Sequence, residues 1–202
     1  FYSFNKSIGG NNIGLFAYYL ASPLNLLLIL FPKSAIGEFI FIIYLIKIGL
    51  ASLCFSLYIS KVYKKKDLFV VIFSLCYALM SYNICFQMNI MWMDGMMLLP
   101  LVALGIEEII LKGKYKLYMI VLFMVVVSNY YIGYMICIFS VVYFFYKSII
   151  YKKISLPRTF KFFGASFITG GLASFLLIPV LISLSNGKAN FNLFSEAITI
   201  KQ

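Results

Sequence analysis

Long apolar runs, separated by short polar or basic stretches, alternate along the whole chain. A hydrocarbon core about 30 Å thick needs roughly 20 apolar residues in each helix that crosses it. The runs are close to this length, so they predict an all-α fold: a polytopic transmembrane helix bundle with some short or re-entrant helices. The predicted spans cover about residues 37–60, 68–86, 95–111, 117–128, 131–146 and 160–184.

The longest apolar run covers residues 117–146, which is 30 positions. As a single helix it would be about 45 Å long, well beyond a core of about 30 Å. Its centre, SNYYIGY at residues 128–134, contains Ser, Asn and Gly. We therefore predict two short helices, 117–128 and 131–146, which cross a thinned or protein-lined region or form a re-entrant hairpin.

The first part of the chain differs from the rest. Residues 1–14 are polar and rich in Gly and Asn, which is typical of a loop. Residues 15–32 are apolar but contain Pro23 and Asn25, so they fit either a pair of interfacial or re-entrant helices or one poor span. The expected regions are an outer segment at 1–36, a transmembrane bundle at 37–184 and the start of a further outer segment at 185–202.

Composition agrees with a membrane protein, because 63% of residues are hydrophobic, 11% are charged and the mean hydropathy is +1.00. Soluble domains carry roughly 25% charged residues.

The chain starts at Phe1 rather than Met and ends in a polar stretch, so we expect a piece of a longer protein.

The distribution of basic residues predicts the orientation. If the run at 117–146 is divided, 12 of the 17 Lys and Arg residues fall on one side of the membrane. Loops rich in Lys and Arg face the cytoplasm, so the segments 1–36, 87–94, 128–131 and 185–202 are expected to face outward. The 12 basic residues are at positions 61, 64, 65, 66, 112, 114, 116, 147, 152, 153, 158 and 161.

The residue types exclude several chemistries. The chain has no His, and its four Cys residues form no CxxC pair, so the usual zinc, haem and Ser-His-Asp sites are not expected. The net charge of +11 comes from basic clusters between the apolar runs. This pattern indicates the orientation of the chain in a membrane rather than nucleic-acid binding. No cofactor is clearly implied, and a divalent cation remains an open alternative.

The segment QMNIMWMDG, residues 87–95, carries the strongest candidate chemistry, because it lies where a span meets the outer surface. Asp94 could act as a general base, a metal ligand or a hydroxyl acceptor, or it could simply cap the following helix. Trp92 could stack on a sugar or anchor the chain in the interface. Gln87 and Asn89 are further candidate substrate-binding residues.

Lys47 lies near the middle of a predicted span, where an ionisable side chain is costly and marks a functional candidate. It could reach a lipid phosphate or pair with a carboxylate, or it could snorkel toward the interface. Asn129, Tyr130 and Tyr134 lie at the next outer boundary, where they could line a cavity or form an aromatic belt.

The opening loop supplies the remaining candidates. Gly9 and Gly10 would let backbone N–H groups approach an anion, whereas the alternative is a flexible external loop. The candidate substrate-binding side chains in this loop are Asn5, Lys6 and Asn12.

Three segments together carry a family resemblance: FYSFNKSIGGNNIGLFAYYLASPLNLLLILFP, NIMWMDGMMLLPLVALGIE and SNYYIGYMICIFSVVYFFY. In order and spacing they resemble the bacterial YfhO family of membrane proteins, over nearly the whole chain. That family is similar to the GT-C class of glycosyltransferases. The resemblance implies a multi-pass enzyme of the bacterial plasma membrane whose site faces outward.

The implied reaction moves a sugar from a polyprenyl-phosphate donor to a cell-envelope acceptor such as lipoteichoic acid. Membrane lipids are further expected partners, and nucleic acid is not. In such proteins the main catalytic acid lies upstream of the FYSFNK-like stretch, so the resemblance leaves Asp94 as the catalytic candidate within this chain. A polytopic transporter or lipid flippase is the alternative, since broken helices and Lys47 suit it as well; a non-catalytic assembly factor is a third reading.

Overall fold

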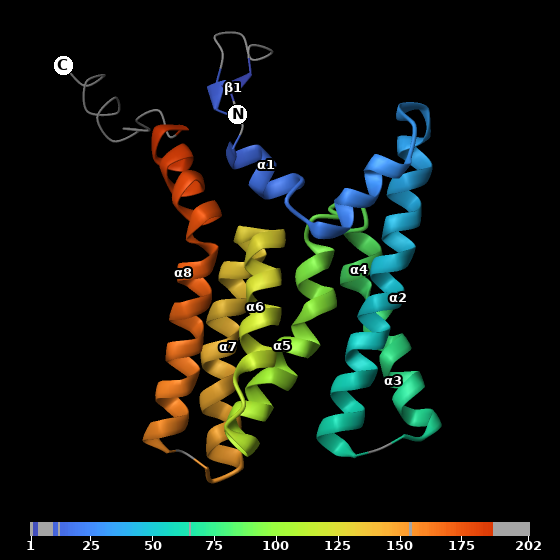
Figure 1. Cartoon of the computed structure of the whole chain (residues 1–202). Helices are drawn as coiled ribbons and strands as arrows, with labels where there is room; N and C mark the ends of the chain where they lie inside the picture. The colour runs from blue at the N-terminus through green and yellow to red at the C-terminus, as the bar shows by residue number, and fades with distance from the viewer. Residues whose placement is uncertain (1, 4–9, 12, 65, 154, 188–202) are drawn as a thin grey trace, which may run out of the picture.

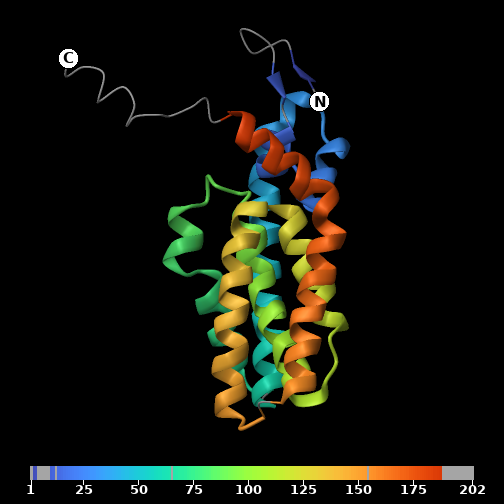
Figure 2. The same cartoon turned by 90° about the vertical axis from the view of Figure 1, so that its left-hand side faces the viewer.

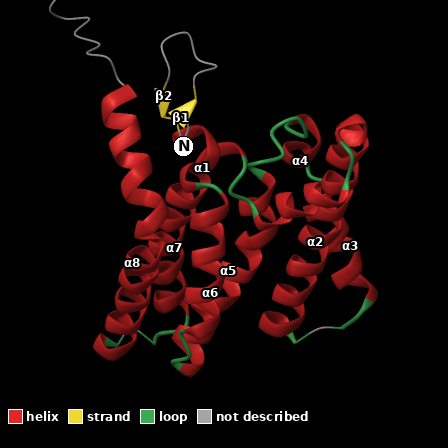
Figure 3. Cartoon of the chain, turned by 45° about the horizontal axis from the view of Figure 1, so that its top comes forward, coloured by secondary structure: helices red, strands yellow, loops and turns green. Residues whose placement is uncertain are grey.

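The computed structural model describes residues 2–3, 10–11, 13–64, 66–153 and 155–187. They form an upright bundle of helices, so the predicted all-α bundle is confirmed (Figure 1). The strands in the described part are one short antiparallel pair, β1 (Tyr2–Ser3) with β2 (Gly10–Asn11), near the start of the chain (Figure 3).

The helices follow the apolar runs, with short helices before the first long one. The bounds are α1 Ile13–Tyr19, η1 Pro23–Leu30, η2 Lys33–Ala35, α2 Ile36–Tyr63, α3 Leu68–Ala78, α4 Ser81–Cys85, α5 Met93–Lys112, α6 Lys116–Ser128, α7 Tyr130–Ile150 and α8 Leu156–Gly187. The apolar stretch 15–32 is thus broken before Pro23 into two short helices, α1 and the 3₁₀ helix η1.

Within the described residues, four helical segments are long and apolar enough to cross a membrane: Lys33–Tyr63, Leu68–Cys85, Tyr130–Ile150 and Leu156–Ser183. The other two predicted spans are also helices. α6 has 13 residues, and α5 carries acidic residues in its first turn and near its end. Figure 2 shows α4 projecting at the edge of the bundle.

The bundle has two chemically distinct ends. The turns between α2 and α3, α5 and α6, and α7 and α8 lie together at the bottom of Figure 1, and we call this the basic end. They contain Lys64, Gly113 and Lys152, which adopt the left-handed conformation that terminates helices. The opposite end holds α1, the segment between α4 and α5, and the junction of α6 with α7; we call it the α1 end.

The helix α5 forms the centre of the bundle, where it packs against α2, α6, α7 and α8. Most of its side chains are buried, whereas most of those of α2, α3 and α8 face outward. Pro100 lies inside α5 and has no N–H to donate to the Met96 carbonyl one turn earlier. The hydroxyl of Tyr77 donates to that carbonyl instead, at 2.7 Å, so the buried acceptor is satisfied from α3.

Small residues let α5 and its neighbours approach closely, as is typical of helix packing in membranes. A Cβ at Gly105 would lie 2.7 Å from Cα of Tyr118 on α6. At the junction of α6 and α7, a Cβ at Gly133 would lie 2.9 Å from Cα of Val126. These close approaches pack α5 against α6 and α6 against α7, beneath the α1 end.

Candidate functional site

A buried ion pair joins α2 to α5 near the α1 end. The ammonium nitrogen of Lys47 lies 2.8 Å from Oδ2 of Asp94, and the two side chains are 0% and 2% exposed. Lys47 also donates to the backbone carbonyl of Ile90 at 2.9 Å. Two residues that the sequence singled out separately therefore form one unit, which also holds the segment that leads into α5.

Asp94 does not occupy the helix N-cap, which was one of its predicted roles. Asp94 lies within the first turn of α5, and the N-cap residue is Trp92. The prediction that Asp94 caps the helix is therefore wrong, although a carboxylate in the first turn still interacts favourably with the helix dipole. Behind it, Gly95 leaves room for Ile132 of α7, because a Cβ at Gly95 would collide with that side chain.

The pairing limits what either group can do in this conformation. A buried charge is tolerated when it is paired and hydrogen-bonded, and removing one partner leaves the other uncompensated. Asp94 is 1% exposed, so its carboxylate has almost no surface to offer a substrate. Lys47 is not a free cation for a lipid phosphate, because its ammonium group is already bound to Asp94 and Ile90.

Tyr18 of α1 connects Trp92 and Asn129 at the α1 end. The indole nitrogen of Trp92 donates to the hydroxyl of Tyr18 at 2.9 Å. The side-chain amide of Asn129 donates to the backbone carbonyl of Tyr18, also at 2.9 Å. The ring of Tyr130 packs edge-on against Tyr18, with 5.9 Å between the ring centroids. Residues far apart in the sequence thus meet in one cluster, which we call the Tyr18 cluster (Tyr18, Trp92, Asn129 and Tyr130).

Asn129 also determines where α7 begins. Its side-chain oxygen accepts hydrogen bonds from the backbone N–H groups of Tyr131 and Ile132, both at 3.0 Å. This satisfies two of the donors that a helix start leaves unpaired. The chain therefore turns sharply between α6 and α7, and the same side chain ties that turn to α1.

We expect Asn129→Ala to lower the free energy of unfolding by about 1–2 kcal/mol, because it removes a helix cap. It also removes the bond to Tyr18, so amide hydrogen exchange in α1 should accelerate. Chemical unfolding in detergent and hydrogen exchange measure the two effects.

Asn129→Asp separates the two roles of this side chain. Aspartate keeps the oxygen that caps α7 but cannot donate to the Tyr18 carbonyl. We therefore expect the first turn of α7 to exchange at near the wild-type rate, because its cap is kept, while exchange in α1 accelerates. If exchange in α1 stayed at the wild-type rate in both variants, the proposed tie between Asn129 and α1 would be wrong.

The other predicted site residues lie around this cluster or outside the described part. Gln87 is exposed and Asn89 is partly buried in the segment before α5. Tyr134 is 67% exposed on α7, facing away from the protein interior. Asn5, Lys6 and Asn12 of the opening loop lie outside the described residues.

An apolar cavity of about 540 Å³ lies beside the Tyr18 cluster, between α1, η1 and α2. Ile90, whose carbonyl binds Lys47, lines it, as do Tyr19 and Phe39. The hydroxyl of Ser22 also lies at this cavity and is buried, with no hydrogen-bond partner among the described residues. The α1 end therefore combines an apolar cavity, an aromatic and amide cluster and a buried ion pair.

Sequence reasoning missed Tyr18 and Ser22. Both lie in the apolar stretch 15–32, where one tyrosine among 16 and one small hydroxyl carry no distinguishing pattern. Their importance arises from the turn before Pro23, after α1 has packed against α8, α6 and α7 with Tyr18 bonded to Trp92 and Asn129. No group of three or more His, Cys, Asp and Glu side chains in the described part of the chain could hold a metal ion.

Comparison with known proteins places the whole chain in one family. The family model described as "Bacterial membrane protein YfhO" matches residues 1–202. Searches of curated proteins and of solved structures gave no match. The apolar spans and the match over the full length agree, and the chain belongs to the YfhO family of bacterial membrane proteins.

Proposed function

We propose that this chain is part of a membrane glycosyltransferase that moves a sugar from a polyprenyl-phosphate donor to a cell-envelope acceptor, such as lipoteichoic acid, on the outer face. The observation that carries the proposal is the apolar cavity of about 540 Å³ next to the Tyr18 cluster. A lipid-linked donor needs an apolar cavity for its isoprenoid chain and a neighbouring cluster with polar atoms for its sugar phosphate.

In this proposal the apolar chain and the polar sugar of the donor bind to different parts of the α1 end. The isoprenoid chain enters the cavity from the surrounding lipid, past Leu20, whose side chain is 55% exposed. The sugar then lies near Trp92 and Tyr18, since Tyr19 and Ile90 of the cavity wall neighbour them in sequence. Aromatic rings with a polar atom suit sugars, which present both apolar faces and hydroxyl groups.

In the transfer, an acceptor hydroxyl attacks the anomeric carbon of the sugar while the bond to the donor phosphate breaks. A base takes the hydroxyl proton, and the polyprenyl phosphate leaves with the electron pair. Because Asp94 is buried against Lys47, we assign it a positioning role, in which the pair fixes the segment that carries Ile90 and Trp92. Its predicted role as a catalytic residue stays a prediction.

The experiment is a transfer assay with the full-length protein in proteoliposomes, with a labelled sugar on polyprenyl phosphate. We expect Trp92→Ala to lower kcat/KM by roughly 10- to 100-fold, the loss typical of a misplaced substrate. Phe160→Ala is the matched control, because Phe160 is 72% exposed and lies near the basic end.

Unchanged transfer by Trp92→Ala would overturn the assignment of the α1 end. Movement of the labelled lipid across the bilayer without label in the acceptor polymer would favour a flippase instead.

A further inference from the structure

A second buried carboxylate lies on α5, at the basic end. Oε1 of Glu107 accepts from the ammonium group of Lys147 at 2.9 Å and from the hydroxyl of Tyr143 at 3.0 Å. The Glu107 side chain is only 2% exposed. Its other oxygen, Oε2, is buried and accepts no hydrogen bond from the residues that the structure describes, although the hydroxyl of Tyr151 at the end of α7 also interacts with this carboxylate. A buried acceptor on a charged group is costly to leave unpaired, so this atom calls for a donor.

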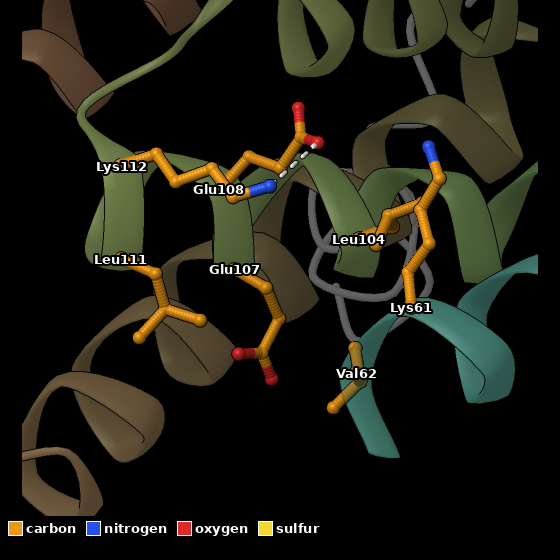
Figure 4. A pocket seen from close by; sticks show the side chains of 7 residues that line it. All are labelled: Lys61, Val62, Leu104, Glu107, Glu108, Leu111 and Lys112. Atoms are coloured by element: carbon orange, nitrogen blue, oxygen red, sulfur yellow. Dashed lines mark ion pairs between the residues drawn. The ribbon is translucent and has the colours of Figure 1, made fainter. Parts of the chain in front are cut away.

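Glu107 lines a cavity of about 230 Å³ between the ends of α2 and α5. Figure 4 shows its carboxylate between the side chains of Val62 and Leu111. Glu108 and Lys112 lie on the other side of α5 and face each other across 4.0 Å. Lys61 contributes a further ammonium group from α2. The cavity lining therefore combines the unpaired acceptor of Glu107 on one side of α5 with the exposed cations Lys61 and Lys112 on the other.

The charges around the cavity do not balance. Lys61 and Lys112 of the lining balance Glu107 and Glu108, and Lys147, which pairs with Glu107 from outside the lining, adds one positive charge. A bare cation is disfavoured by this excess, even though Glu107 offers an acceptor. A ligand with one negative charge and a hydrogen-bond donor matches both the charge and the unpaired atom.

The surroundings indicate a lipid as the source of that ligand. Leu111 at the cavity is 39% exposed, and Tyr63, which follows Val62 on α2, is 60% exposed. Leu68 at the start of α3 is 72% exposed. Apolar side chains of a membrane protein that are exposed in this way face acyl chains, so a headgroup can enter the cavity while its tails remain in the bilayer.

We propose that this cavity binds the glycerol phosphate headgroup of an anionic phospholipid, phosphatidylglycerol. A headgroup hydroxyl donates to Oε2 of Glu107, and the phosphodiester lies against the ammonium groups of Lys61 and Lys112. The site lies at the opposite end of the bundle from the Tyr18 cluster and does not depend on the proposed transfer reaction.

The test measures lipid retention by the purified chain in detergent, using native mass spectrometry. Phosphatidylglycerol is compared with phosphatidylmethanol of the same acyl chains, which has the same charge but no headgroup hydroxyl. We expect phosphatidylglycerol to bind roughly tenfold more tightly, the effect of one hydrogen bond to a charged group. Soluble glycerol 3-phosphate at the same concentration should not displace it.

Three variants test the assignment of residues. Glu107→Gln places an amide donor where the acceptor was, so it should abolish the preference for the hydroxyl-bearing lipid. Lys61→Gln changes an exposed side chain that the fold does not need, and it should weaken both lipids by a similar factor. Lys153→Gln is the matched control, because Lys153 is exposed at the same end but does not line the cavity.

Equal binding of the two lipids by the wild-type chain would overturn the proposal. The same holds if Lys61→Gln binds lipid as well as Lys153→Gln does. Displacement of phosphatidylglycerol by glycerol 3-phosphate would show a site for a soluble phosphate and would overturn the assignment to a lipid. These results stand even if Glu107→Gln fails to fold, because they use the wild-type chain and surface variants.

Discussion

Asp94→Leu is expected to lower the free energy of unfolding by about 3–5 kcal/mol, the cost of leaving a buried charge without its partner. Lys47 is 0% exposed and cannot reach water without moving α2 or α5. The measurement is reversible unfolding in mixed micelles with increasing denaturing detergent. Glu38→Leu is the control, because Glu38 is an exposed acid in the first turn of α2 and should change stability by less than about 0.5 kcal/mol.

The double variant Lys47→Met/Asp94→Leu completes this experiment. Replacing both members of a buried ion pair by apolar residues of similar volume is often neutral, so most of the lost stability should return. A double variant no more stable than Asp94→Leu alone would show that the destabilisation has another origin.

The same double variant separates the two roles open to Asp94. A positioning residue whose place is filled by an apolar pair should leave reduced but measurable transfer in the full-length protein. Complete loss from a stably folded double variant would instead support the prediction that Asp94 is catalytic.

Gly105→Ala is expected to lower the free energy of unfolding by up to about 3 kcal/mol, because the new methyl group would overlap the backbone of α6. The nearest atom would be Cα of Tyr118 at 2.7 Å, and backbone cannot rotate away as a side chain can. α5 and α6 would therefore have to separate, and the buried ring of Tyr118 would lose its packing. Thermal unfolding in detergent measures this loss of stability directly.

Gly49→Ala is the matched control, because Gly49 also lies inside a helix but a Cβ there meets no atom of the described residues within 4 Å. Alanine is the better helix former by up to about 1 kcal/mol, so this variant should be neutral or slightly stabilised. If both variants behaved alike, the close approach of α5 and α6 would not contribute to stability.

The apolar pattern predicted the helices well because burial in lipid requires long apolar runs, and these are visible in the sequence. The division at Asn129 followed from a length argument, and the structure places a helix cap there. The predicted second span instead contains a break between α3 and α4, at Leu79 and Met80. The polar residues Ser81 and Asn83 directly follow that break, and the side-chain amide of Asn83 donates to the carbonyl of Ala78 at 2.9 Å, so these residues are the signal that the prediction of one span missed.

The candidate site was only partly predictable. Lys47 and Asp94 stood out because charges are rare in such a chain, and either could be suspected of having a partner. Their pairing, and that of Glu107 with Lys147, depends on how α2, α5 and α7 pack, which a single sequence does not state. Tyr18 was hidden for the same reason: its bonds to Trp92 and Asn129 come from the path of α1 across the bundle.

Photo-crosslinking with a polyprenyl-phosphate sugar that carries a diazirine in its isoprenoid chain tests the proposed donor site at the α1 end most directly. The full-length protein in its native membrane is labelled, digested and mapped by mass spectrometry. We expect label in peptides that contain residues 16–25 and Ile90, reduced by unlabelled donor but not by ordinary phospholipid. Label spread evenly over the lipid-facing surfaces of α2, α3 and α8, with no competition by the donor, would contradict the proposed donor site at the α1 end.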